Sequence, residues 1–177
     1  MDYKSLKTLE YHKIIEKLSS YAGSEAARKM CADLKPMTDI NSINDALTQT
    51  SDALSRIYAK GSVSFSGVTN IIDSIKRLEV GSTLNTHELL NISAVLTTAA
   101  AAKSHYEETN DSLTDYFNSL EPLTPLNTQI KNCIISEEEI SDDASGTLRD
   151  IRRQMRISAD RIHTELNKIL NSPSTRS

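Results

Sequence analysis

The segment from Leu148 to Leu170 constrains the fold of this chain more than any other, and it reads LRDIRRQMRISADRIHTELNKIL. Its apolar residues recur at steps of three and four, the spacing that keeps one face of an α-helix apolar. A helix of this length spans about 33 Å at a rise of 1.5 Å per residue, so it can cross a small domain and project beyond it. We expect it to be seated on the rest of the protein through Leu148, Ile151, Met155, Ile162 and Leu166.

The composition favours an all-α fold. The sequence has only 5 Gly and 4 Pro, which leaves little turn material for many short strands, and it has no Trp. Apolar steps of three and four recur along the chain and are separated by Gly, Pro and capping residues. We therefore predict an irregular multi-helix bundle of about seven or eight helices with a long C-terminal helix.

Several helix ends can be placed by their capping residues. Ser24 and Ser145 are the expected N-caps of two helices, because a serine hydroxyl accepts a hydrogen bond from an amide of the first turn. Asn85 and Glu88 have the spacing of a capping box. The stripe from Leu6 to Leu18 predicts one helix, whereas residues 135–140 are too few to tell a small hairpin from a loop.

Four arginines of the long helix are the candidate contact residues for nucleic acid or a partner. They lie three or four positions apart, so at least three share one sector of the helix surface. They are Arg149, Arg152, Arg153 and Arg156. Such a sector can follow a phosphate backbone, or it can pair with Asp150, Asp160 or acidic groups on neighbouring helices. Ion pairing and solvation is the interpretation we favour.

The net charge of −4 argues against a domain built wholly for nucleic-acid binding. The charge is unevenly placed, because an acidic run over residues 137–143 directly precedes the four arginines. One interpretation of the acidic run is that its carboxylates interact favourably with the positive end of the dipole of the long helix. The alternative is that the arginines of that helix form a basic docking surface.

No catalytic, cofactor-binding or metal-binding motif stands out in the sequence. It contains no phosphate-binding GxxxxGK[ST] loop and no GxSxG, HExxH or EF-hand pattern. The four histidines have no paired ligand spacing, and the two cysteines, Cys31 and Cys133, have no zinc spacing. The N-terminus has no apolar signal-peptide core, and no apolar run is long enough for a membrane span. We expect a cytoplasmic protein that has no contact with membranes.

Three segments together resemble the N-terminal region of the bacterial MutS-II family, the MutS paralogue that typically carries a C-terminal Smr domain. They are SLKTLEYHKIIEKL, GVTNIIDSIKRLEVGSTLNTHELLNISAVL and SDDASGTLRDIRRQMRISADRIHTEL. The second is the most specific, through Gly67, Ile71, Arg77, Gly81, Leu84, Glu88, Leu89 and Leu90. One departure is Gly146, where many relatives have proline at the first helical position.

The resemblance implies a helical core over residues 1–140 and the start of a lever or clamp helix over residues 141–177. It implies that the chain stops before the clamp, ATPase and Smr domains, so ATP and Mg²⁺ are expected only in the ATPase domain outside it. The longer protein is then expected to be a homodimeric ATPase with an Smr endonuclease domain. It would act on DNA, as branched or recombination intermediates, or on collided ribosomes in quality control.

A free-standing helical adaptor is the alternative interpretation. Its last helix would dock into a groove of a partner protein or self-associate as a coiled coil. The apolar stripe drifts from a strict heptad, because Ser158 and Glu165 occupy two expected seam positions, which favours packing on a globular surface. An enzyme acting alone has no residues to support it.

Overall fold

A computed structural model describes residues 3–106 and 108–171 of the chain. Within these residues the fold is all-α, as predicted, with nine α-helices, one short 3₁₀-helix and no β-strand. The helices are α1 Tyr3–Thr8, α2 Tyr11–Tyr21, α3 Glu25–Ala32, α4 Ile40–Lys60, α5 Ile72–Glu79, α6 Thr86–His105, α7 Thr114–Asn118, α8 Thr124–Cys133 and α9 Gly146–Leu170, and the 3₁₀-helix η1 is Asp142–Ala144.

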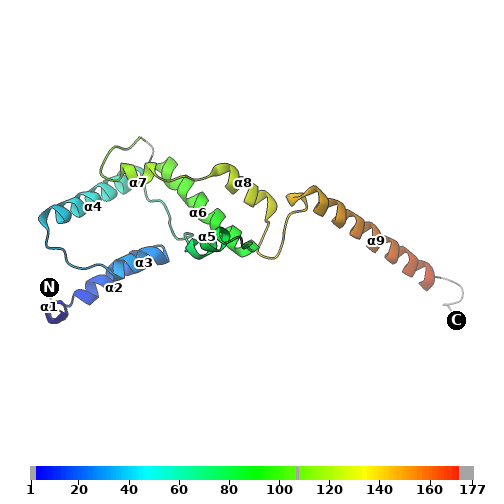
Figure 1. Cartoon of the computed structure of the whole chain (residues 1–177), viewed down its shortest axis with the longest axis horizontal. Helices are drawn as coiled ribbons and strands as arrows, with labels where there is room; N and C mark the ends of the chain where they lie inside the picture. Colours follow the sequence, from blue (N-terminus) through cyan, green and yellow to red (C-terminus); the bar gives the residue numbers. More distant parts are fainter. Residues whose placement is uncertain (1–2, 107, 172–177) are drawn as a thin grey trace.

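The helices form an elongated molecule, with α1 to α3 at one end and α9 projecting at the other (Figure 1). The buried apolar residues gather in the middle, where α6 packs against α7 and α8. They are Leu96, Ala102, Tyr106, Ile130 and Ile134, and each has less than a tenth of its surface exposed. The core of the described part of the chain is therefore the α6–α8 group, and α9 extends away from it.

The first expected helix is in fact two helices. The chain breaks at Leu9 and Glu10, and Glu10 adopts a left-handed conformation with φ of 53° between α1 and α2. The Glu10 carboxylate then accepts a hydrogen bond from the ammonium of Lys13 at 2.6 Å. The prediction of one helix from Leu6 was wrong. The helical spacing of the apolar residues continues across the break, so this spacing gives no sign that the chain leaves one helix and begins another.

The predicted caps are confirmed. Ser24 accepts a hydrogen bond from the amide of Ala27 at the start of α3, and Ser145 accepts one from Leu148 at the start of α9. Asn85 and Glu88 form the complete capping box of α6, each side chain accepting from the other residue's amide. Local hydrogen bonds therefore fix these three helix starts.

Residues 134–140 form a tight turn that brings the chain back on itself before α9. Ile134 and Ile140 make a single antiparallel bridge, and the amide of Ile135 donates to the carbonyl of Glu139 at 3.0 Å. The amide of Ser141 then donates to the carbonyl of Cys133 at 2.8 Å, at the end of α8. This arrangement places η1 between the end of α8 and the start of α9.

Candidate functional site

The base of α9 is held by contacts with η1, the 3₁₀-helix that also packs against α8. Asp142 is the central residue of this junction. Its carboxylate accepts hydrogen bonds from Arg152 at 2.5 Å and from both terminal nitrogens of Arg156 at 3.2 and 3.3 Å. Because Arg152 and Arg156 lie one turn apart, a single carboxylate fixes two successive turns of α9.

Two further contacts strengthen the same junction. Arg152 also donates to the backbone carbonyl of Ile140 at 2.7 Å, and Arg149 pairs with Asp143. The hydrogen bond from Arg152 is the main reason that the pKa of the Asp142 carboxyl lies below its usual range; burial opposes this effect, and the hydrogen bonds from Arg156 add to it. We call Asp142, Asp143, Arg149, Arg152 and Arg156 the base clamp.

The base clamp shows how the four candidate arginines are used. Three of them pair with carboxylates, as the favoured interpretation predicted, but the partners are Asp142 and Asp143 before the helix and not Asp150 or Asp160 within it. Arg153 is exposed, and its side chain has no hydrogen bond or ion pair with any of the residues that the structure describes. Arg153 is therefore the arginine of this set that remains available for an external anion.

The acidic run is divided between two contacts. Asp142 and Asp143 belong to the base clamp, whereas the carboxylate of Glu137 lies 2.9 Å from Nδ1 of His87, near the start of α6. The carbonyl of Glu137 also accepts a hydrogen bond from the hydroxyl of Thr86. The run thus connects the turn at residues 134–140 to both α6 and α9, in addition to any interaction with a helix dipole.

The apolar stripe of α9 is not seated on the other described helices. Leu148 is half-buried, but Ile151, Met155, Ile162 and Leu166 keep 48%, 65%, 61% and 51% of their surface exposed. The structure therefore differs here from the packing that we expected. The reason is geometric, because α9 leaves the α6–α8 group at its base and continues into open space (Figure 1).

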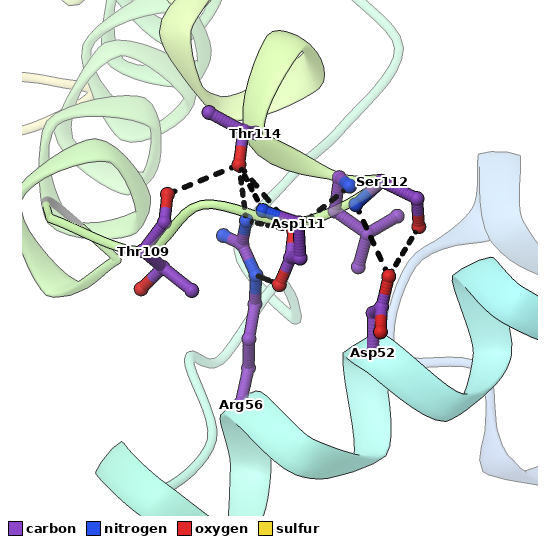
Figure 2. Close-up of polar contacts among 7 residues, drawn as sticks. Asp52, Arg56, Thr109, Asp111, Ser112 and Thr114 are labelled. Carbon is purple, nitrogen blue, oxygen red and sulfur yellow. Dashed lines mark hydrogen bonds and ion pairs between the residues drawn. The ribbon is translucent and has the colours of Figure 1, made fainter.

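A second polar cluster, centred on Arg56 of α4, was not found by sequence reasoning. The Arg56 side chain is 3% exposed, and its Nε and Nη2 donate to the two carboxylate oxygens of Asp111 at 2.7 and 2.5 Å (Figure 2). Nη2 also lies 3.3 Å from the hydroxyl of Thr114. Nothing in the sequence indicates that Arg56 and Asp111, which are 55 positions apart, are in contact. The only local sign is the order Asp111, Ser112, Leu113, Thr114, which is typical of a capped turn.

The surroundings of this pair favour its charged form. The hydrogen bond from Arg56 holds the pKa of the Asp111 carboxyl below its usual range, and the same bond raises the pKa of Arg56. The guanidinium carbon lies 4.6 Å from the centre of the Phe117 ring and 5.1 Å from that of Tyr106, which are cation–π distances. Asp52, one turn before Arg56, accepts hydrogen bonds from the amide and hydroxyl of Ser112 (Figure 2).

Arg77 and Glu88, two residues on which the family resemblance depends, are in direct contact. Nη1 and Nη2 of Arg77 donate to the Glu88 carboxylate at 2.7 and 3.2 Å, and Nη2 also donates to the carbonyl of Thr83. The hydrogen bond from the amide of Asn85 is the main reason that the pKa of Glu88 lies below its usual range. Arg77 therefore joins α5 to the capping box of α6.

Comparison with known proteins identifies the family. No protein-family model matches the chain. It is 55% identical over 99% of its length to the protein named Endonuclease MutS2 of Lachnospira eligens, and 50% identical over 99% to that of Lachnoclostridium phytofermentans. It is 37% identical over 97% of its length to Endonuclease MutS2 of Clostridioides difficile. The chain belongs to the MutS2 family. It spans 22–23% of the length of these relatives.

The resemblance expected from the three segments is thus confirmed, and it extends over nearly the whole chain. This MutS2 segment has no group of His, Cys, Asp or Glu that could hold a metal ion among the residues that the structure describes. Over the same residues, no helix is both long enough and apolar enough to cross a membrane. Apart from three ion pairs between residues three positions apart, the groupings of charged side chains among the described residues are the base clamp, the Arg56 cluster, the Arg77–Glu88 contact and the His87–Glu137 contact.

Proposed function

We propose that this chain is the non-catalytic helical core and lever segment of a MutS2-type protein. In this proposal α9 carries movement between an ATPase and a clamp that lie elsewhere in the longer protein, and the longer protein acts on DNA or on ribosomes. The relatives are named endonucleases, which supports a nucleic-acid substrate. The observation that carries the proposal is the attachment of α9, a helix of 25 residues, through the base clamp.

The geometry of the base clamp suits the transmission of movement. Packed helices move as rigid bodies or shift between discrete packings, so a stiff helix fixed at its base can turn a small rotation into a large displacement at its far end. Asp142 is bonded to Arg152 and Arg156 on successive turns, so it fixes both the direction and the rotation of α9 about its own axis. The division between a core and a lever near residue 140 remains a prediction.

The test is Asp142→Asn in the full-length protein, compared with Asp150→Asn. Both variants remove one negative charge near the base of α9, but Asp150 is exposed and has no ion pair among the described residues. We expect Asp142→Asn to reduce the stimulation of ATP hydrolysis by DNA or ribosomes about fivefold or more, because the amide cannot serve two guanidinium groups as a carboxylate does. Asp150→Asn should retain the stimulation. Equal stimulation in the two variants would show that the base clamp does not contribute to the coupling between the ATPase and the bound DNA or ribosome.

One observation also favours the alternative, a helical interaction module. The apolar stripe of α9 is exposed over Ile151, Met155 and Ile162, and an exposed apolar helix face is suited to docking against another helix or groove. Sedimentation equilibrium of the isolated chain over a range of concentrations distinguishes self-association of α9 as a coiled coil from docking of α9 into a different partner. A mass that rises with concentration indicates self-association, whereas a constant mass of 19.6 kDa excludes the coiled coil formed by two copies.

A further inference from the structure

Arg56 has an unused hydrogen-bonding group in the interior of the protein. Its Nε and Nη2 are engaged by Asp111 and Thr114, whereas Nη1 is buried and has no hydrogen-bond partner. Figure 2 shows this third nitrogen on the side of the guanidinium that faces away from Asp111. Buried polar atoms in folded proteins nearly always have a partner, and those without one need a specific explanation.

A cavity lies beside this arginine. Its volume is about 350 Å³, and its lining includes Arg56, Lys103, Tyr106 and Phe117. That volume is at the lower end of the range for small-ligand sites in proteins. The residues Glu108 and Asn110, which are exposed, also line it and connect it with the surface. The cavity is therefore open on one side, while the cationic group sits in its wall.

A second cation lines the same cavity. The ammonium group of Lys103 donates to the carbonyls of Leu120 at 2.9 Å and Asn118 at 3.3 Å. An ammonium group has three N–H donors, so one remains. Lys103 has no carboxylate partner among the described residues. Glu108, the carboxylate in the lining of the cavity, is exposed and forms no ion pair with Lys103, and Asp111 is occupied by Nε and Nη2 of Arg56. Arg56 and Lys103, two cationic side chains in the lining of the cavity, thus each have an unused donor, and the donor of Arg56 is covered by neighbouring atoms.

We propose that this cavity is a binding site for a small oxyanion, a phosphate or carboxylate group, which accepts hydrogen bonds from Nη1 of Arg56 and Nζ of Lys103. This site goes beyond the proposed lever function and does not depend on it. Charge-assisted hydrogen bonds to oxyanions are stronger than neutral ones, and arginine and lysine are the residues that supply them. Because Nη1 is closed off from solvent, the side chains that cover it must move slightly for the anion to enter, which restricts the site to small groups.

The experiment is a titration of the full 177-residue chain, labelled with ¹⁵N, with inorganic phosphate and separately with sodium acetate at constant ionic strength. The observed signal is the side-chain N–H of Arg56, assigned with Arg56→Lys. We expect phosphate or acetate to shift this signal saturably with a Kd of about 1 mM, typical of a site with few contacts. Saturation by phosphate alone identifies a phosphate site, and saturation by acetate as well extends the ligand to carboxylates.

Lys103→Gln and Lys131→Gln form the matched pair of variants. Glutamine at position 103 retains N–H donors for the carbonyls at the end of α7, whereas Lys131 is exposed on α8 and lies outside the lining of the cavity. We expect Lys103→Gln to weaken the binding about tenfold, the usual loss for a hydrogen bond to a charged group, and Lys131→Gln to leave it unchanged. An Arg56 signal that does not move with either anion, or equal affinities in the two variants, would overturn the proposal. Should Lys103→Gln fail to fold, the titration of the unaltered chain decides alone.

Discussion

At the scale of single residues, Arg56 and Asp111 join segments that are 55 positions apart. The side chains are 3% and 15% exposed, so the pair lies largely out of solvent. Removing one partner of a buried ion pair leaves an uncompensated charge, which is far more costly than the net value of the pair itself. The attachment of α4 to the region of α7 therefore depends strongly on both side chains.

We predict that Asp111→Asn lowers the free energy of unfolding by about 3 kcal/mol. Asp115→Asn is the control, because Asp115 is exposed on α7 and has no ion pair among the described residues, and it should change the free energy by less than about 0.5 kcal/mol. Urea denaturation followed by circular dichroism measures both. A loss in Asp111→Asn no larger than in the control would show that the pair contributes little.

The pH dependence of the stability of Asp111→Asn provides a second test of the Arg56–Asp111 pair. The pKa of Asp111 is lower in the folded state than its ordinary value of 3.8, so its contribution to stability is fully present above that value and is lost as the pH falls through the folded pKa. The difference in urea midpoint between the unaltered chain and Asp111→Asn should therefore be constant near neutral pH and shrink below pH 3.8. A difference that grows as the pH falls would contradict the assignment.

Arg153 differs from its three neighbours because it has no carboxylate partner within the described residues. An unpaired cation gains more from a phosphate than one that is already neutralised, and each phosphate contact adds about 0.9 to the slope of log affinity against log salt for duplex DNA. We predict that Arg153→Gln lowers this slope by about one unit in the full-length protein. Arg149→Gln, the control, removes an arginine already paired with Asp143 and should change the slope less. Equal slopes for all three proteins would exclude Arg153 from DNA contact.

At the scale of secondary-structure elements, much of the fold could be predicted from the sequence because the deciding interactions are local. The cap hydrogen bonds at Ser24, Asn85 and Ser145 join residues three positions apart, and each cap was predicted from the local sequence. The break at Glu10 was missed because a left-handed glutamate leaves the apolar pattern unchanged. The Arg56 cluster could not be predicted, since hydrogen bonds between α4 and residue 111 depend on how distant segments meet.

The start of α9 offers a test of helix initiation. Gly146 is the first residue of α9, its φ is not in the left-handed region, and an added Cβ would meet nothing within 4 Å. Alanine there reduces the entropy of the unfolded chain without strain, so Gly146→Ala should stabilise the protein by about 0.5–1 kcal/mol. Gly81→Ala is the control, because Gly81 has φ of +82° and alanine would be strained there. Thermal unfolding should move upward for the first variant and downward for the second.

At the scale of the whole molecule, stability is unevenly distributed. The buried apolar residues lie in α6 and α8 and at the C-terminal ends of these two helices, at Tyr106 and Ile134, whereas no residue of α9 is buried. Isolated helices are marginal in water, because most helix stability in proteins comes from the packing of an apolar face. The sequence predicted the stripe of α9 correctly as a pattern but could not show whether other parts of this chain cover it.

This distribution predicts a gradient of amide hydrogen exchange in the isolated chain at low concentration. The amides around Leu96 and Ala102 of α6 should exchange most slowly, because their opening requires disruption of the core. The amides of α9 beyond Arg156 should exchange fastest among the long helices, because that part lies beyond the base clamp and its apolar residues are exposed. Mass spectrometry after exchange and proteolysis measures both regions. Protection of residues 157–170 equal to that of α6 in a monomer would show that the stripe is covered within the chain, and a helix covered in that way could not act as a projecting lever.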